Sequence, residues 1–246
     1  MVVTGGSRGL GLGMVEALVA RGARVTVVAR DRAGLAEVAK RAGAAVQPGD
    51  ATDAALMDAI VAEVRPSVLI LNAGGPPHMA PIDEQTWDTF CAVWNTDVKA
   101  ALYGIQAALK TPLPPGSRVL ITSGGFAIRG APLGGGSAGA KRMLWFMAQY
   151  ANARATERKF DMRFQALLPL QPPGESRIGQ GITAWYARRQ GISVEAFLAT
   201  RDDTLLPPRQ WGEHVATLLT DPDYDTGVAY GITADPGKTG ITLLDG

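Results

Sequence analysis

Ser137 and Lys141 are the two residues whose types and spacing most directly suggest chemistry. They stand four positions apart in residues 137–157, a stretch that predicts a long helix. Residues at that spacing share one helix face, and a lysine beside a serine can activate the hydroxyl as a nucleophile. No nucleophile-elbow motif and no histidine accompanies the pair. Redox-neutral covalent chemistry at Ser137 is therefore one hypothesis, and it depends on spacing alone.

A cluster of glycines near the N-terminus predicts a different kind of site. Gly5, Gly9 and Gly11 follow an apolar strand at residues 1–4 and begin a helix expected over residues 10–21. In that setting one glycine permits a tight turn, another lets the backbone approach a pyrophosphate, and a third lets the helix pack on the sheet. The free N–H groups and the positive dipole end of the helix favour phosphate. These residues predict a dinucleotide site.

The end of the second expected strand indicates which dinucleotide is bound. An acidic residue there would accept hydrogen bonds from a ribose 2′-hydroxyl, but the chain has Arg30, and Arg8 in the glycine turn can reach the same place. Two guanidinium groups suit a 2′-phosphate, which favours NADP(H) over NAD(H). The opposing alternatives are that Asp31, the expected N-cap of the helix at residues 31–41, turns toward the ribose, or that both arginines are only solvated. Asp50, after the third strand, is expected to accept from the adenine amino group.

Strand-like and helix-like segments alternate along the chain and position these residues. Strands are expected at residues 1–4, 24–29, 44–47, 67–71, 118–122, 162–168 and 227–233, and helices at residues 10–21, 31–41, 53–64, 83–108 and 137–157. This order predicts an α/β fold, a Rossmann-type, doubly wound parallel sheet with a ligand crevice at the carboxyl ends of its strands. We expect a single domain, residues 1–246. Residues 170–208 are expected to form a helical lid over the substrate, or alternatively a flap that only packs.

The composition excludes several classes of protein. The chain has 246 residues, 46% of them hydrophobic and 19% charged, with a net charge of +1, which gives no reason to expect a nucleic acid or membrane partner. One cysteine excludes a disulfide framework and fits a reducing cytoplasm. The two histidines are isolated, so no metal site is expected. No secretory signal or membrane-spanning run is visible.

Taken together, the spaced motifs resemble the short-chain dehydrogenase/reductase family over nearly the whole chain. Residues 4–11 match the family pattern T-G-x-x-x-G-x-G, and residues 72–74 match its N-A-G. Asn95, Ser123 and Lys141 stand where the family places its catalytic asparagine, serine and lysine. The resemblance implies hydride transfer between a nicotinamide and a carbonyl or alcohol. The dinucleotide contacts that we expect are Gly5, Ser7, Arg8, Gly9, Leu10, Gly11, Arg30, Asp50, Ala51, Asn72, Ala73, Gly74 and Lys141.

The chain departs from the family at the proton donor. In the family a serine holds the substrate oxygen, a tyrosine supplies the proton, a lysine lowers the pKa of that phenol, and an asparagine holds a water that feeds the lysine. Here Ser137 stands at the tyrosine position, and an alkyl alcohol is a far weaker acid than a phenol, because its pKa lies well above that of tyrosine. Either Ser123 or Gly124 stands at the position where the family has its catalytic serine. Residues 169–171 replace the usual Pro-Gly turn, and Ser176 is the candidate contact to the nicotinamide amide.

Two further hypotheses therefore follow from the resemblance. The first is an NADP(H)-dependent carbonyl or alcohol oxidoreductase with a non-standard proton donor, such as a water held by Ser137, Ser123 and Lys141. The second is an NADP(H)-binding member without redox activity, and a tyrosine-to-serine variant of an active reductase would look the same. Tyr186 and His78 are less favoured as substitute donors. Tyr150 is expected to face away from Ser137, and Tyr103 to lie roughly on the face of Asn95 but about 12 Å further along the helix.

Two predictions concern partners. The helices at residues 83–108 and 137–157 carry more apolar side chains than one sheet face covers, so we expect a homodimer or homotetramer. The alternative is that the surplus is ordinary core. Trp185, Tyr186, Met79 and Phe126 indicate a fairly apolar small-molecule pocket.

Overall fold

The sheet of this protein has eight strands, seven of them parallel, in the order β3-β2-β1-β4-β5-β6-β7-β8. The computed structural model describes residues 1–174, 177–200 and 205–244. The strands are β1 (Val2–Thr4), β2 (Thr26–Ala29), β3 (Ala45–Pro48), β4 (Val68–Leu71), β5 (Ser117–Thr122), β6 (Met162–Pro169), β7 (Ala229–Ile232) and β8 (Ile241–Leu243). β4 lies on the opposite side of β1 from β2, which confirms the doubly wound order. The sequence did not predict β8, a short strand that pairs antiparallel with β7.

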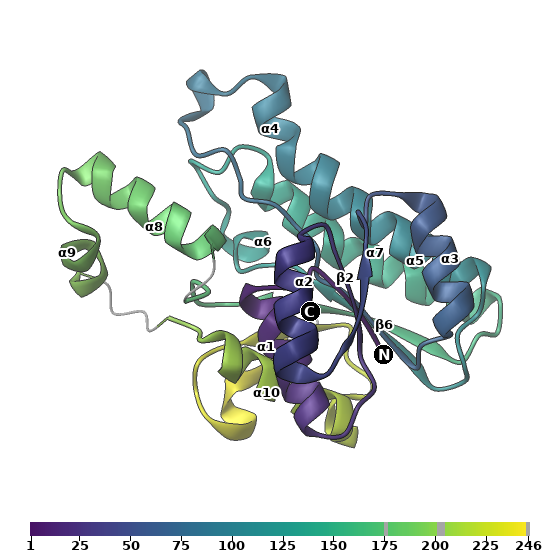
Figure 1. The fold of residues 1–246 in the computed structure, drawn as a ribbon. Helices are drawn as coiled ribbons and strands as arrows, with labels where there is room; N and C mark the ends of the chain where they lie inside the picture. The colour runs from purple at the N-terminus through teal and green to yellow at the C-terminus, as the bar shows by residue number, and fades with distance from the viewer. Residues whose placement is uncertain (175–176, 201–204, 245–246) are drawn as a thin grey trace.

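Helices cover both faces of the sheet (Figure 1). On one face lie α1 (Gly9–Ala20), α2 (Arg32–Ala42) and α10 (Pro208–Thr220). On the other lie α3 (Ala54–Val64), α5 (Lys99–Lys110) and α7 (Ser137–Glu157). α4 (Trp87–Val93) and the short α6 (Phe126–Arg129) precede α5 and α7. No helix among the described residues has the length and hydropathy needed to cross a bilayer.

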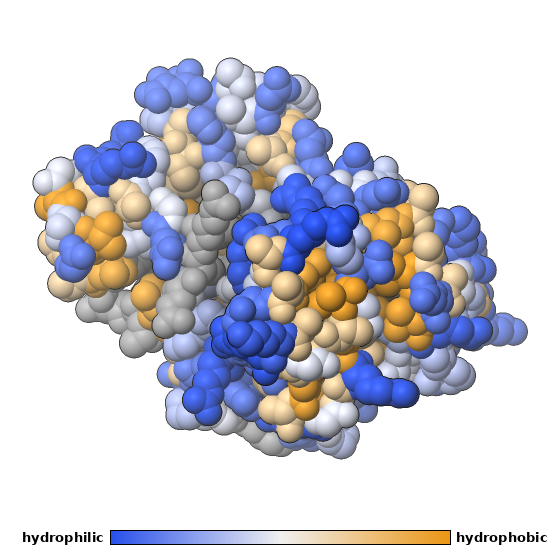
Figure 2. Space-filling view, in the orientation of Figure 1, coloured by the Kyte–Doolittle hydropathy of each residue, from blue (hydrophilic) through white to orange (hydrophobic). Residues whose placement is uncertain are grey.

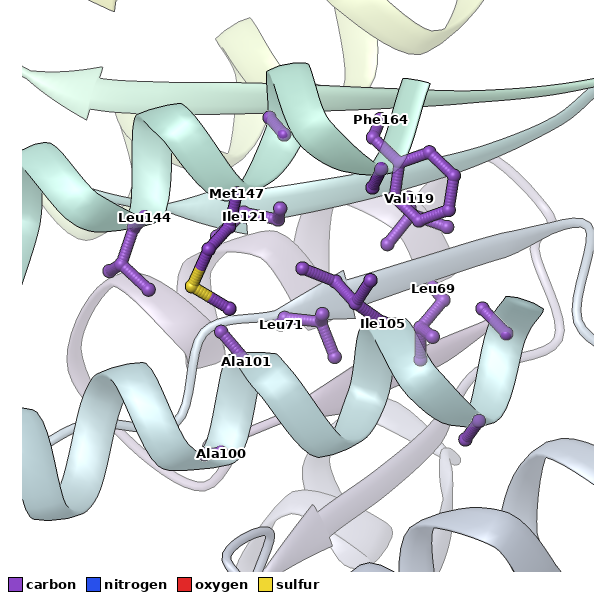
Figure 3. Close-up of a cluster of buried hydrophobic side chains, with 14 of the residues drawn as sticks. Leu69, Leu71, Ala100, Ala101, Ile105, Val119, Ile121, Leu144, Met147 and Phe164 are labelled. Atoms are coloured by element: carbon purple, nitrogen blue, oxygen red, sulfur yellow. The ribbon is translucent and has the colours of Figure 1, made fainter. Parts of the chain in front are cut away.

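The core between the sheet and the α5–α7 pair fixes the floor of the crevice. Figure 3 shows leucine, valine, isoleucine and phenylalanine side chains of β4, β5 and β6 packed against both helices. The labelled members are Leu69, Leu71, Ala100, Ala101, Ile105, Val119, Ile121, Leu144, Met147 and Phe164, all nearly inaccessible to solvent. Because strands in a parallel sheet are buried on both faces, they consist almost wholly of apolar residues. Exceptions on β5 and β6 are the buried polar residues Ser117, Arg118 and Gln165.

The segment expected to be one helix over residues 83–108 is interrupted. α4 ends at Val93, a π-helical turn covers Trp94–Val98, and α5 begins at Lys99. A π-helical turn changes the phase of the side chains that follow and is common at functional sites. It determines which residue of this segment faces α7.

The predicted lid consists of α8 (Arg177–Gln190) and α9 (Val194–Ala199), which extend from the body of the molecule (Figure 1). The rings of Tyr186 and Phe197 stack with centroids 5.8 Å apart, so the two helices pack on each other. A single β-bridge between Pro173 and Leu206 joins the two ends of this segment. Its role over the substrate stays a prediction.

Candidate dinucleotide and substrate site

The glycine turn lies tightly against the end of β4. Gly5 and Gly9 have φ angles of +67° and +54°, a region that favours glycine. A Cβ on Gly5 would lie 2.8 Å from the Cα of Ala73, and one on Gly11 would lie 2.2 Å from the carbonyl oxygen of Gly5. The Asn72 side-chain amide donates to the carbonyls of Thr4 and Gly5 at 3.3 and 3.2 Å. The turn therefore has no room for a side chain at Gly5 or Gly11, and Asn72 at the end of β4 holds it in place.

One cavity of about 950 Å³ joins this turn to Lys141. Every residue predicted to contact the dinucleotide lines it: Gly5, Ser7, Arg8, Gly9, Leu10, Gly11, Arg30, Asp50, Ala51, Asn72, Ala73, Gly74 and Lys141. Ser123, Gly124 and Ser137 line it as well. The N-terminus of α1 opens into the same space, so unpaired N–H groups and a positive dipole end are available to an anion.

Two arginines and two aspartates line the end of the cavity where the adenosine is expected: Arg8, Arg30, Asp31 and Asp50. Arg30 lies 3.5 Å from Asp50 and remains largely exposed, and Arg8 is exposed beside it. Asp31 caps α2 by accepting from the N–H of Gly34 at 3.2 Å, as its expected N-cap position requires. This cap uses one oxygen of the Asp31 carboxylate.

Asp50 is held by its neighbours at the third strand's end. Its Oδ1 accepts from the Thr52 N–H and from the Thr52 hydroxyl, both at 2.9 Å. The backbone N–H of Thr52 is the main cause that lowers the pKa of Asp50, and the Thr52 hydroxyl and Arg30 add to it against the effect of burial. Asp50 therefore stays ionised and oriented as a hydrogen-bond acceptor.

Asp97, not Asn95, is the residue of the π-helical turn that meets Lys141. The Lys141 Nζ donates to Asp97 Oδ2 at 2.7 Å, and the Asp97 side chain is only 3% exposed. Asp97 also accepts from the Gly75 N–H and the Thr96 hydroxyl, each at 2.8 Å. Asn95 is exposed and does not line the cavity. The prediction that Asn95 serves Lys141 is wrong in position, because the π-helical turn brings a residue two places later to that face.

The Ser123 hydroxyl is already used within the protein. Its Oγ donates to the Lys141 carbonyl at 2.7 Å and so ties β5 to α7. The next residue, Gly124, faces the cavity side of the lysine, since a Cβ there would lie 3.7 Å from the Lys141 Cγ. The alternative noted in the sequence, that Gly124 takes the position of the alcohol-holding residue, is the one that this geometry favours. The cavity wall then lacks a hydroxyl at this point.

Ser137 lines the cavity, but its oxygen is turned away from it. The residue is 2% exposed, and the Oγ is inaccessible and has no hydrogen-bond partner. A Cβ on Gly134 would lie 2.5 Å from this Oγ, so the hydroxyl points into the preceding loop. In this arrangement Ser137 contributes no proton donor to the cavity.

Other residues considered as donors or contacts are dispersed. Tyr186 lines the cavity from α8, whereas Tyr103 packs against the core and Tyr150 is 60% exposed on α7. His78 is exposed in the loop after Gly74. The Gln171 side chain accepts from the Ala234 N–H, and Ser176 lies outside the described residues. Within the described ranges no group of three potential metal ligands comes together.

The sequence analysis missed Asp97 and left the choice between Ser123 and Gly124 open. Asp97 has polar neighbours, Asn95, Thr96 and Lys99, so no local pattern distinguishes it from Asn95. Gly124 follows a serine at the end of a buried strand, where the position of a single residue decides which side chain faces the ligand. The inward turn of the Ser137 hydroxyl has no sequence signal.

Comparisons with known proteins agree on one family. The family model for short chain dehydrogenase matches residues 1–149. A galactitol 2-dehydrogenase of Rhizobium johnstonii is 43% identical over 82 residues, 30% of this chain and 32% of that protein. An uncharacterized oxidoreductase of Mycobacterium tuberculosis is 35% identical over 133 residues, 50% of this chain and 49% of that protein. The chain thus spans between a third and a half of the length of these relatives.

Among solved structures, a short-chain dehydrogenase/reductase of Brucella melitensis, titled glucose/ribitol dehydrogenase, superposes with a TM-score of 0.79. The match covers 95% of this chain and 94% of that one at 20% sequence identity. At that identity it supports the fold.

Proposed function

Since this chain belongs to the short-chain dehydrogenase family, we propose that it is an NADP(H)-dependent oxidoreductase acting on a carbonyl or alcohol, with a proton donor other than a tyrosine. The observation that carries the proposal is the single cavity that runs from the glycine turn at the start of α1 to the Lys141–Asp97 pair. The glycine turn that would bind the dinucleotide and the Lys141 side chain both line this cavity.

The residues present fit a dinucleotide. The backbone of Gly5, Gly9 and Gly11 leaves the space that side chains would fill, and the N-terminus of α1 faces it. Arg8 and Arg30 supply two positive charges for a 2′-phosphate, while Asp31 is occupied as a helix cap. These contacts favour NADP(H) over NAD(H). When bound, the nicotinamide would donate or accept the hydride.

Lys141 is the residue that we assign to proton transfer. The hydroxyl oxygens of Ser123 and Ser137 are engaged or buried away from the cavity, so a water shared among all three residues does not fit this arrangement. The Lys141 Nζ carries protons, is partly exposed to the cavity and is oriented by Asp97. In the reducing direction it would donate a proton to the substrate oxygen, and the resulting amine would be reprotonated by solvent. Positioned acid catalysis contributes roughly 10²- to 10⁴-fold.

A second candidate function is NADP(H) binding without redox turnover. The specific observation in its favour is that neither serine presents a free hydroxyl to the cavity. Such a protein would bind the dinucleotide as a sensor or scaffold. Serine–lysine nucleophilic chemistry is disfavoured by the same inward turn of the Ser137 oxygen.

NADPH consumption with a panel of ketones and aldehydes separates the two candidates. The oxidoreductase proposal expects turnover by the unaltered protein that requires Lys141. Turnover that appears only in a Gly124→Ser, Ser137→Tyr double variant, with NADPH binding unchanged, would favour the binding protein. No NADPH binding in either form would contradict both.

We further propose that the chain forms a homodimer or homotetramer in the cytoplasm through the outer faces of α4, α5 and α7. Part of the apolar surplus is core, since Val93, Leu144 and Met147 are buried. Trp87 is 76% exposed and Leu102 is 41% exposed, so apolar surface remains for a second copy. Light scattering of the purified protein tests this, and a monomer at micromolar concentration would contradict it.

A further inference from the structure

A second, smaller cavity lies between the loop after β4 and the lid helix α8. It has a volume of about 280 Å³ and is lined by Pro76, Pro77, His78, Met79, Gly181, Ile182 and Trp185. Pro76, Pro77 and Ile182 also line the main cavity, so the two spaces share these walls. The smaller cavity therefore extends the substrate half of the main cavity along α8.

The surfaces around this extension are apolar. Phe126, Leu170, Ile182, Phe197, Leu198 and Leu205 line the lid side of the main cavity. The Trp185 ring meets Tyr186 edge-on at 5.5 Å, and Tyr186 in turn stacks on Phe197, which holds the aromatic wall in place. Figure 2 shows apolar side chains on the lobe that α8 and α9 form, with hydrophilic ones beside them.

Few charged groups in this half are available to a substrate. Lys141 is assigned to the substrate oxygen in the function proposed above, and Arg129 donates to the Leu170 carbonyl at 3.0 Å. Among the described residues that line the smaller cavity, His78 is the one ionisable side chain. A sugar alcohol needs a partner for each hydroxyl that it buries, because unpaired polar groups oppose binding. An apolar chain needs none.

We propose that the substrate of this protein carries an unbranched aliphatic chain of medium length, which lies between residues 76–79 and the Gly181–Trp185 face of α8. The proposal deepens the function proposed above and rests on it. The carbonyl or alcohol end would lie near Lys141, with the chain extending into the smaller cavity. Each methylene group that is buried there should increase affinity about fourfold.

Gly181 provides the variant that tests this placement. A Cβ on Gly181 meets nothing within 4 Å, so a leucine side chain has space to occupy the smaller cavity without displacing backbone. Leucine is also a much better helix former than glycine, so Gly181→Leu should fold. Gln180→Leu is the matched control, because Gln180 precedes it on α8, is exposed and lines neither cavity.

The measurement is calorimetric binding of 2-butanone, 2-hexanone and 2-octanone to NADP⁺-saturated protein, with ribitol as the polyol. We expect affinity to rise about 10-fold or more per two methylenes in the unaltered protein and in Gln180→Leu. Gly181→Leu should lose this gain for 2-octanone and leave 2-butanone within about twofold. Any one of four results would overturn the proposal. The three ketones could bind equally tightly, ribitol could bind more tightly than the ketones, or no ketone could bind. In the fourth, affinity would depend on chain length in Gly181→Leu as it does in the unaltered protein.

The same samples distinguish this failure from failure of the proposed function. Chain-length-dependent binding without NADPH consumption supports the apolar subsite and contradicts the oxidoreductase. Turnover of 2-butanone without any chain-length dependence supports the oxidoreductase and overturns the subsite.

Discussion

The ammonium of Lys141 and the carboxylate of Asp97 form a direct ion pair of 2.7 Å between α7 and the π-helical turn. The pair is well shielded, since the two side chains are 20% and 3% exposed. Asp97 also receives hydrogen bonds from Gly75 and Thr96, so it joins the loop after β4 to the lysine. This contact decides which residue of the 94–98 segment belongs to the site.

Replacing Asp97 with asparagine should show how much this pair matters. Asp97→Asn keeps the shape but leaves the Lys141 charge without its counterion, and the free energy of unfolding should fall by about 1–3 kcal/mol. Asn95→Ala, two positions away and exposed, should change it by less than about 0.5 kcal/mol. Urea unfolding of the three proteins measures both values. Equal losses in the two variants would contradict the placement of Asp97.

Lys141 and Ser137 should differ sharply in their effect on turnover. Ser137→Ala removes a buried hydroxyl that has no partner, so turnover should stay within about twofold and stability should not fall. Lys141→Met removes the proposed proton donor and should reduce kcat by roughly 10²- to 10⁴-fold. Steady-state NADPH oxidation tests the pair. A Ser137→Ala protein as inactive as Lys141→Met would refute the assignment of the proton to lysine.

The preference for NADP(H) should depend on the two arginines at the adenosine end. Hydrogen bonds to a charged group are each worth about 1.5–3 kcal/mol, so Arg8→Ala and Arg30→Ala should each weaken NADPH binding by about 10- to 100-fold. NADH binding should be nearly unchanged. Arg24→Ala, exposed and outside the cavity, is the control. Equal effects on NADPH and NADH would mean that neither arginine contacts a 2′-phosphate.

Arg118 should be the most costly arginine to remove from the sheet. It is 6% exposed on β5 and donates to Gln165, to the Leu218 carbonyl at 2.7 Å and to the Tyr224 carbonyl at 3.2 Å. Arg118→Ala removes the buried donor from Gln165 and from the Leu218 carbonyl, whereas the Tyr224 carbonyl keeps its bonds from the Gln165 amide and the Tyr230 hydroxyl. The free energy of unfolding should fall by about 3–5 kcal/mol.

Its neighbour across the β5–β6 ladder serves as the control. Arg163 is 48% exposed and lies 3.6 Å from Asp225, so Arg163→Ala should cost less than about 1 kcal/mol. Chemical denaturation compares the two, and similar losses would contradict the account of Arg118 as a buried hydrogen-bonding centre.

His214 should make stability depend on pH. The ring is 4% exposed, its Nε2 has no hydrogen-bond partner, and burial lowers its pKa in the folded protein. Because the unfolded chain binds the proton more readily, this residue's contribution to stability is lost as pH falls below about 6.5.

The pH dependence can be isolated by substitution. His214→Leu should remove this residue's part of the decline between about pH 6.5 and 5, whereas His78→Leu, at an exposed position, should retain it. Thermal unfolding across that range is the measurement. An unchanged decline in His214→Leu would exclude His214 as a cause.

Much of the fold follows from local patterns in the sequence. The apolar strands at residues 67–71 and 118–122 are recognisable because a parallel sheet buries both faces. The helix from Ser137 to Glu157 and the cap at Asp31 have the bounds and contact that the pattern predicts. β8 is only three residues long and depends on pairing with β7, so no local signal marks it.

The parts of the site that the sequence missed depend on helix phase and side-chain rotation. The π-helical turn brings Asp97 to Lys141 in place of Asn95. The spacing of residues in the sequence does not predict such a turn. Packing between distant segments decides where the two serine hydroxyls point. The Ser123 hydroxyl donates to the Lys141 carbonyl, and the Ser137 hydroxyl lies against Gly134. The glycine turn was predictable because its backbone geometry requires a specific residue type.

NADPH binding to the unaltered protein and to Gly11→Ala is the most direct test of the central claim. A Cβ at residue 11 would lie 2.2 Å from the Gly5 carbonyl oxygen and would disturb the turn that faces the phosphates. Fluorescence titration should show saturable NADPH binding, tighter than NADH binding, that weakens at least tenfold in Gly11→Ala, while circular dichroism shows both proteins folded. Absence of binding to the unaltered protein, or equal affinity in both, would contradict the account.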